Sequence, residues 1–236
     1  MSVGSLLIVQ ITAFIIGWAG PWRDPPERHS NGRVAWPIRM GLSFSMVLGA
    51  FLVWLGAPAR SPAAAYAVFT LFGMIASFIG DLIMARLIPA PNRLIGGMVA
   101  FAAAHALYIR GYAAAVSAAG ESLLNFGLIL ALIVFVAATF FGWREYVRNP
   151  RKSDALNIGA LAYGSWIAIM ASSAVGMATA LGGHWWLAAL GGLSFIASDF
   201  LIGVTDIREK HIENANDWIW LTYLAGQMGI IYAAAA

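Results

Sequence analysis

The sequence predicts an all-α protein, a bundle of about eight helices that cross a membrane. Hydrophobic residues make up 61% of the 236 residues and charged residues only 11%, whereas soluble proteins average about 25% charged residues. A helix needs roughly 20 apolar residues to cross the hydrocarbon core, and short polar loops divide the chain into about eight such runs. We therefore expect a multi-pass integral membrane protein, of the bacterial inner membrane, with residues 1–236 forming a single domain.

Prolines and glycines mark where the expected spans end. The first span stops at Pro21, the third before Pro89, and Gly182-Gly183 turns the sixth tightly into the seventh. The first span lacks the basic n-region of a signal peptide, so we interpret it as a retained helix. In chain order, the spans cover about residues 3–20, 37–55, 63–88, 94–118, 123–143, 155–181, 185–204 and 218–232.

The basic residues predict how these spans are oriented, because cytoplasmic loops retain Lys and Arg. The connections after spans one, three, five and seven carry four, two, four and two basic residues when Arg39 and Arg86 are included, and the other connections carry only Arg60 and Arg110. Both termini are therefore predicted to lie outside the cytoplasm. This topology accounts for the net positive charge, so no nucleic-acid partner is expected.

Two aspartates inside apolar runs are the leading candidates for a functional site. Asp81 lies in FGMIASFIGDLIM and Asp199 in GGLSFIASDFLIG, each shortly after a Ser-Phe-Ile sequence. Ionisable groups in membrane spans are costly, and they usually face the protein interior or a wet cavity. We expect these two carboxyl groups to be the catalytic pair.

The aspartates also suggest an internal repeat. They are separated by 118 positions, half of the chain, and the same shift superposes His105 on Tyr223. Four spans per half would make residues 1–118 and 119–236 two parallel four-helix repeats. The alternative is that small and aromatic residues recur by chance in an apolar protein.

Helical spacing predicts which supporting side chains share a face with each aspartate. Gly73, Ser77 and Asp81 are four residues apart and form a small-residue ridge on which another helix can pack, so Asp81 faces protein. Ser198 lies beside Asp199 but is turned aside.

Four further polar side chains lie on two shared faces. His105 and Tyr108 share a face of the fourth span, and Tyr223 and Gln227 share one of the eighth. At about 1.5 Å per residue, both aspartates and Tyr223 lie in the cytoplasmic third, and His105 lies near the midplane as the floor of a cavity. A His or Tyr in a span can instead serve only as a hydrogen-bonding residue between helices.

Arg39, at the mouth of the second span, has two interpretations. It can act in catalysis or, as Arg93 also can, bind a lipid phosphate, or it can only extend its side chain to the headgroups.

Two other chemistries do not fit this residue content. A catalytic zinc ion takes three protein ligands, but only His105 lies deep, and the other histidines fall in loops or at span ends (His29, His184 and His211). The chain contains no cysteine and no G-x-S-x-G sequence, which excludes a thiolate nucleophile and a nucleophile elbow. We therefore expect neither a metal nor another cofactor.

Several segments resemble the YhhN family, integral membrane proteins that include animal and bacterial lysoplasmalogenases. The segments are SFIGDLIM, GGMVAFAAAHALYI, AYGSWIAIM, GGLSFIASDFLI and LTYLAGQ, between residues 37 and 232. One departure is Arg39, where the family is expected to have lysine beside proline. The resemblance implies an eight-helix fold and cleavage of the vinyl ether bond of lysoplasmalogens, with a lysophospholipid taken from the membrane as substrate.

Two buried aspartates suit this reaction, since it needs an acid that is protonated at neutral pH and an anion nearby. One carboxyl group protonates the alkenyl carbon, and the other stabilises the resulting oxocarbenium ion and orients water, as in glycosidases. The apolar neighbours of Asp81 favour it as the acid, while Ser198 adjoins Asp199. His105, Tyr108, Tyr223 and Gln227 would position water and the ether oxygen.

A second interpretation is a proton-coupled transporter or a lipid-binding membrane protein, in which matched aspartates relay protons and no bond breaks. Parallel repeats favour it, but no span carries the central Gly or Pro interruption that often builds transport sites. A purely structural membrane protein is a third, and the buried aspartates argue against it.

Overall fold

A computed structural model describes residues 2–23 and 32–235 and confirms the all-helical fold. Arg28 and His29 lie outside these ranges. The described residues form eight α-helices: α1 (Val3–Ala19), α2 (Trp36–Gly56), α3 (Pro62–Met84), α4 (Arg93–Ala118), α5 (Phe126–Gly142), α6 (Asp154–Leu181), α7 (Trp186–Ile202) and α8 (Ala215–Tyr232). Short helical turns flank α5 and α7: η2 (Trp143–Val147), η3 (Gly183–Trp185) and η4 (Gly203–Ile207).

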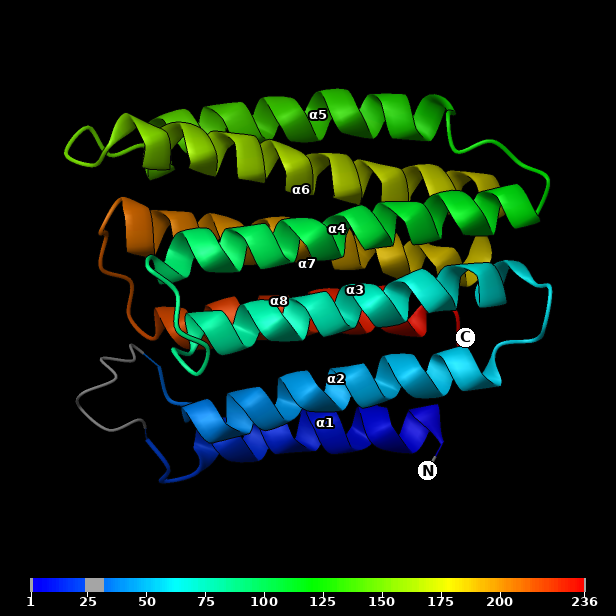
Figure 1. Cartoon of the computed structure of the whole chain (residues 1–236), viewed down its shortest axis with the longest axis horizontal. Helices are drawn as coiled ribbons and strands as arrows, with labels where there is room; N and C mark the ends of the chain where they lie inside the picture. Colours follow the sequence, from blue (N-terminus) through cyan, green and yellow to red (C-terminus); the bar gives the residue numbers. More distant parts are fainter. Residues whose placement is uncertain (1, 24–31, 236) are drawn as a thin grey trace.

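Six helical segments of the described chain are long and apolar enough to cross a membrane. They are α2, α3, α4, α5 with η2, α6, and α7 with η3 and η4. The apolar α1 is shorter, at 17 residues, and α8 has 18 residues and lies alongside the others (Figure 1). The chain is therefore a multi-pass integral membrane protein.

Three helix ends differ from the predicted ones by three or more residues, and one of them is the start of α5, which lies at Phe126 and not near residue 123. We expected the third span to reach residue 88, but α3 ends at Met84, and Arg86 then adopts a φ of 60°. We expected the eighth to begin near residue 218, but α8 begins at Ala215 after Asn214, which has a φ of 52°. In both places a left-handed backbone conformation turns the chain where the hydropathy pattern gives no signal.

Side-chain caps fix the starts of five helices. The capping residues accept hydrogen bonds from backbone N–H groups in the first turns of α1, α3, α4, α5 and α6, and they are Ser2, Ser61, Asn92, Asn125 and Ser153. Such caps satisfy donors that have no partner within the helix. Each of these five helices therefore begins at a defined residue.

The helices form a ring with one helix outside it at each end. α2 packs against α3 and α8, α6 packs against α4 and α7, and the pairs α3–α4 and α7–α8 close the two sides. Outside the ring, α1 lies against α2 and α5 against α6 (Figure 1). The antiparallel pair α3–α4 and the antiparallel pair α7–α8 therefore face each other across the centre of the molecule.

The helix contacts have the same form in both halves of the chain. The contacts of α1 with α2, α2 with α3 and α3 with α4 recur as α5 with α6, α6 with α7 and α7 with α8. This pattern is what two parallel four-helix units would give, and the duplication itself stays a prediction. Both termini lie at one end of the bundle (Figure 1), and their orientation relative to the cytoplasm also stays a prediction.

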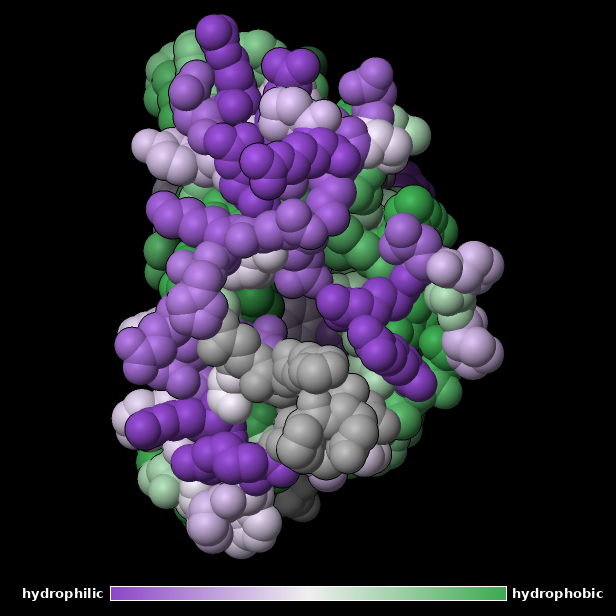
Figure 2. Space-filling view, turned by 90° about the vertical axis from the view of Figure 1, so that its left-hand side faces the viewer, coloured by the Kyte–Doolittle hydropathy of each residue, from purple (hydrophilic) through white to green (hydrophobic). Residues whose placement is uncertain are grey.

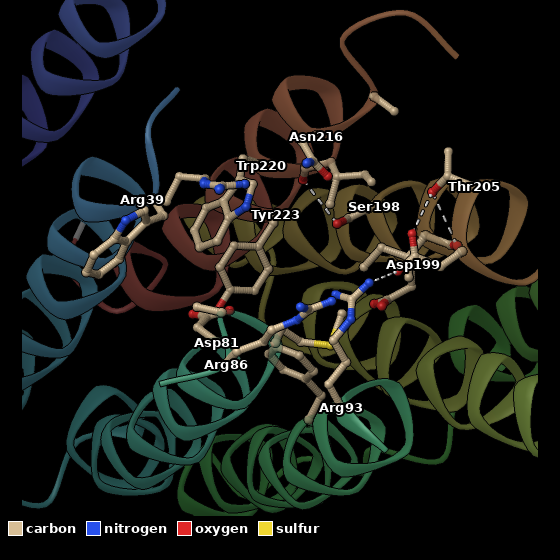
Figure 3. Close-up of a pocket in the computed structure, with 18 of the residues that line it drawn as sticks. Arg39, Asp81, Arg86, Arg93, Ser198, Asp199, Thr205, Asn216, Trp220 and Tyr223 are labelled. Carbon is tan, nitrogen blue, oxygen red and sulfur yellow. Dashed lines mark hydrogen bonds and ion pairs between the residues drawn. The ribbon is translucent and has the colours of Figure 1, made fainter. Parts of the chain in front are cut away.

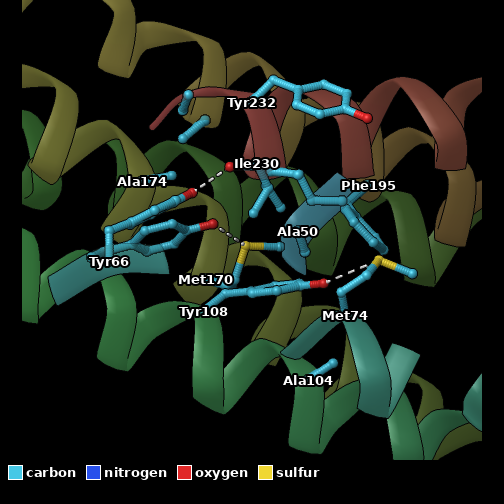
Figure 4. Packing of buried hydrophobic residues seen from close by; sticks show 14 of the residues in the cluster. Ala50, Tyr66, Met74, Ala104, Tyr108, Met170, Ala174, Phe195, Ile230 and Tyr232 are labelled. Atoms are coloured by element: carbon cyan, nitrogen blue, oxygen red, sulfur yellow. Dashed lines mark hydrogen bonds between the residues drawn. The ribbon is translucent and has the colours of Figure 1, made fainter. Parts of the chain in front are cut away.

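A core of buried side chains, many of them aromatic or methionine, fills the ring toward the end where the chain termini lie (Figure 4 shows the packing). The Tyr66 hydroxyl donates to the Ile230 carbonyl oxygen at 2.6 Å, and the Tyr112 hydroxyl lies 3.4 Å from the Met170 sulfur. Glycines let α7 and α8 approach closely, because a Cβ on Gly191 would lie 2.7 Å from the Gly226 carbonyl oxygen. This half of the bundle is therefore densely packed.

The opposite end of the bundle is polar. Most basic residues of the described chain lie there, in the loops after α1, α3, η2 and η4, and Figure 2 shows their hydrophilic side chains around a hollow. Arg60 and Arg110 lie toward the other end. The end with the hollow is the one predicted to be cytoplasmic.

Candidate active site

A cavity of about 440 Å³ opens at this polar end, within the ring. Side chains from α2, α3, α4, α7 and α8 line it, and both aspartates are among them. In Figure 3, Asp81 lies on α3 beside Tyr223, and Asp199 lies across the cavity on α7. Two carboxyl groups that are 118 positions apart in sequence therefore face one space.

Asp81 is held by two hydroxyl groups from neighbouring helices. Its Oδ2 accepts a hydrogen bond from Ser43 Oγ on α2 and another, 2.6 Å long, from the Tyr223 hydroxyl on α8. Asp81 is only 4% exposed, as the small-residue ridge on α3 predicted. Hydroxyl donors on a carboxylate favour its charged form and fix its orientation.

A chain of hydrogen bonds leads from Asp81 into the core. Gln227 donates through Nε2 to the Tyr223 hydroxyl oxygen at 3.2 Å, and its Oε1 accepts from the Tyr108 hydroxyl at 2.8 Å. Tyr108 in turn lies 3.4 Å from Ser77 Oγ. The structure thus brings together five of the side chains singled out from sequence.

Asp199 has a different environment. It is partly exposed to the cavity, and the Tyr163 hydroxyl of α6 lies near enough to interact with its carboxyl group. The carboxyl groups of Asp199 and Asp81 are also close enough to repel each other when both are charged. Repulsion of this kind disfavours the doubly ionised pair.

Two other residues singled out from sequence, His105 and Ser198, do not contact either aspartate carboxyl group through a hydrogen bond that the structure shows. His105 is fully buried and packs against the rings of Tyr108, Tyr163 and Phe195, with 5.2 Å between the His105 and Phe195 centroids. Neither of its ring nitrogens has a hydrogen-bond partner among the described residues. It does not line the cavity; Phe195 does. Ser198 lines the cavity but donates to the Ile219 carbonyl oxygen, joining α7 to α8.

Cationic side chains surround the cavity mouth. The Arg39 guanidinium lies over the Trp220 ring, 5.8 Å from its centroid, and Arg93 forms an ion pair of 3.0 Å with Asp206. Arg86 and Lys210 also line this region (Figure 3 labels the three arginines). Asp206 and Glu209 line the mouth as well, so it carries charges of both signs, and its guanidinium groups are the side chains suited to an anionic headgroup.

A second cavity, of about 530 Å³ and mostly apolar, adjoins the first. It lies between α4, α5, α6 and α7, and four residues line both cavities: Met84, Phe101, Asp199 and Ile202. Asp199 therefore stands at the junction of a polar space and an apolar one.

Sequence reasoning missed three residues of the site. Ser43 follows Arg39 by one helical turn, which was the available signal for it. Tyr163 lies in the AYGSWIAIM segment, and Trp220 precedes Tyr223 by three residues on α8, which was the available signal for it. The contacts that these residues make depend on which helices are neighbours.

The described ranges, 2–23 and 32–235, contain no group of three or more His, Asp or Glu side chains placed to hold a metal ion. His184 lies in η3, before α7, and His211 lies in the loop after η4.

The fold and the site define a class: a polytopic helical membrane protein in which two carboxyl groups from different helices face one cavity near the membrane surface. The chain belongs to the YhhN family, whose model matches residues 8–234, and this family includes lysoplasmalogenases. Comparisons with curated proteins and with solved structures gave no match.

Proposed function

We propose that this protein is a lysoplasmalogenase-like hydrolase that cleaves the vinyl ether bond of a lysophospholipid, giving a fatty aldehyde and a glycerophospho-base. The observation that carries the proposal is the pair Asp81 and Asp199, facing one cavity in unlike surroundings. Membership of a family that includes lysoplasmalogenases supports the substrate class.

The reaction adds one water molecule across the alkenyl ether. A protonated carboxyl group transfers its proton to the alkenyl carbon farther from oxygen, which leaves an oxocarbenium ion. Water adds to this ion and releases a proton to the carboxyl pair, and the hemiacetal then collapses to an aldehyde and an alcohol. The site therefore has to supply one acid and one anion, in the same division of labour that glycosidases use.

The contacts favour Asp199 as the acid and Asp81 as the anion, the reverse of what their sequence neighbours favour. Two hydroxyl groups donate to Asp81 Oδ2 and stabilise a negative charge there. Asp199 is the aspartate that borders the apolar cavity, where an alkenyl carbon would lie. A charged Asp81 would then stabilise the oxocarbenium ion without competing for the proton.

The mouth of the cavity suits the rest of such a substrate. Three arginines line the polar cavity, Arg39, Arg86 and Arg93, and they would bind the phosphate of the headgroup. Tyr223 and Gln227 would hold the Asp81 carboxylate in place, and Tyr108 with Ser77 would hold Gln227.

The experiment is to incubate purified protein with a lysoplasmalogen and a reagent that traps aldehydes. Asp81→Asn and Asp199→Asn should each reduce aldehyde release to background while the protein stays folded, because each removes a protonation state and little volume. Asp217→Asn is the matched control, since Asp217 is also buried but accepts hydrogen bonds from the backbone N–H groups of Arg33 and Val34. It should lower thermal stability and leave kcat unchanged. Activity retained by either of the first two variants would contradict the proposal.

A proton-coupled transporter is the second candidate, favoured by the hydrogen-bond chain from Asp81 through Tyr223 and Gln227 to Tyr108. That chain leads into the packed aromatic core, beside Met74. Proteoliposomes that contain a pH-sensitive dye would decide, since a transporter moves protons on substrate addition and a hydrolase releases aldehyde instead.

A further inference from the structure

The apolar cavity beside Asp199 extends along the outer side of the ring, between α5 and the α4 and α7 helices. Ala131 is the one buried residue of α5, a helix that the structure describes in full. α5 packs on α6 and η2, so the apolar cavity forms a groove over α6, with α5 on one side and α4 and α7 on the other. This cavity is called the groove from here on. Small residues line it on α5 and α6, at Ala138, Gly142, Ala160 and Gly164.

The groove has the length of one membrane leaflet. On α7, its lining runs from Leu193 to Ile202, a rise of about 14 Å at 1.5 Å per residue, and Gly203 and Ile207 of η4 line its polar end. This is about half of the roughly 30 Å hydrocarbon core. Large apolar side chains on its rim are exposed, with Phe141 60% and Leu193 41% exposed, and both lie in helical segments long and apolar enough to cross a membrane. An opening on this apolar outer face suits lipid.

The groove and the polar cavity meet at Asp199. Met84, Phe101 and Ile202 border both spaces, and the basic residues of the mouth lie beyond them. Each volume falls within the range of about 300–1,000 Å³ that ligand sites usually have. A molecule that fills both spaces would place an anionic head in the polar cavity and an apolar chain in the groove. The bond that joins the head to the chain would then lie beside the Asp199 carboxyl group.

We propose that the groove between α4, α5 and α7 holds the hydrocarbon chain of a single-chain lysolipid, which enters sideways from the membrane while its phosphate binds at the arginine-lined mouth. The inference rests on the proposed function only for the bond that is placed beside Asp199. Lipid chains are as apolar as the groove, so occupancy depends on shape and packing rather than on a hydrophobic driving force. A bulky side chain in the groove should therefore exclude the chain sterically.

The first test measures binding without turnover. The probe is a saturated ether lysophospholipid that carries a photoreactive diazirine near the end of its chain, and labelled peptides are identified by mass spectrometry. Labelling should map to α5 and α7 near Ala138 and Leu193, and unlabelled lysophospholipid should compete better than a two-chain phospholipid. Equal competition by the two-chain lipid would mean an ordinary surrounding lipid and would overturn the proposal.

Two adjacent alanines of α5 provide a matched pair of variants. Ala137 and Ala138 are both exposed, but only Ala138 is among the groove residues of the described chain. Ala138→Phe should abolish the labelling and lower kcat/KM for a long-chain lysoplasmalogen at least about tenfold. A substrate with a four-carbon alkenyl chain should be cleaved as well as by the wild type, and Ala137→Phe should behave as wild type with both substrates.

A second pair of variants tests whether a folding defect at one position could explain the loss of activity. Ala197 on α7 lines the groove and Ala162 on α6 does not, and both are exposed. Ala197→Phe should repeat the loss, and Ala162→Phe should not. Equal effects within both pairs would overturn the groove assignment even if the wild type hydrolyses the lipid. Groove labelling without hydrolysis would instead leave the lipid site standing and refute the proposed reaction.

Discussion

The Tyr223 hydroxyl offers the sharpest test of how Asp81 is held. Tyr223→Phe removes the 2.6 Å hydrogen bond to Asp81 Oδ2 and leaves Ser43 as a donor to the same oxygen. A hydrogen bond to a charged group contributes about 1.5–3 kcal/mol, which corresponds to a roughly 10- to 150-fold lower rate. Because the hydroxyl contacts the carboxyl group and not the proposed lipid headgroup, kcat should fall and KM should change little.

Tyr232→Phe is the matched control on the same helix. Tyr232 is 7% exposed and Tyr223 6% exposed, and the Tyr232 hydroxyl donates to Gln10 Oε1 at 2.8 Å, away from the cavity. Its loss should cost about 0.5–1.5 kcal/mol of stability and leave kcat unchanged. The assay is the rate of aldehyde release by both purified variants, beside their thermal unfolding. If Tyr223→Phe keeps kcat within twofold of wild type, or if Tyr232→Phe loses as much, the assigned role of the Tyr223 hydroxyl is refuted.

Three further predictions address topology, chemistry and packing. A reporter fused after the C-terminus should be found outside the cytoplasm and one inserted near Arg148 inside it; the reverse result would contradict the charge-based orientation. The rate should follow a bell-shaped pH profile that belongs to the coupled pair Asp81 and Asp199, chelators should have no effect, and reaction in deuterated water should place deuterium on the second carbon of the aldehyde. Loss of activity with a chelator and recovery with zinc would refute the acid mechanism. Gly191→Leu should separate α7 from α8, since even a Cβ there would lie 2.7 Å from the Gly226 carbonyl oxygen, and both thermal stability and activity should fall; an unchanged unfolding temperature would contradict the close helix packing.

The fold could be predicted largely from hydropathy, because a membrane requires long apolar helices and short polar loops. The predicted spans overlap all eight helices, and the main errors are at Met84, Phe126 and Ala215. At Met84 and Ala215 a turn in the left-handed region sets the boundary. Periodicity also placed Asp81 on a protein-facing side, which its 4% exposure confirms.

Contacts across helices were harder to predict, because periodicity gives the face of a side chain but not its neighbour. His105 was expected at the cavity floor, yet Phe195 from α7 lines the cavity and packs edge-on against its ring. The hydroxyl of Ser43 reaches Asp81 only because α2 packs against α3. The groove beside α5 had no signal in the sequence, since it depends on how far that helix stands from α4 and α7.

Each aspartate lies on the third helix of its half of the chain, Asp81 on α3 and Asp199 on α7, but the residues around them differ. Tyr223 on α8 donates to Asp81 of α3, and the corresponding wall of the other half presents His105 on α4, enclosed by aromatic rings. Tyr163 on α6 lies near Asp199 without a hydrogen-bond partner among the described residues, whereas Ser43 on α2 donates to Asp81. One carboxyl group is thus fixed by two donors, and the other is exposed to the cavity and the groove. This asymmetry within a paired arrangement is what an acid and an anion in one site require, whereas a relay would work with two equivalent carboxyl groups.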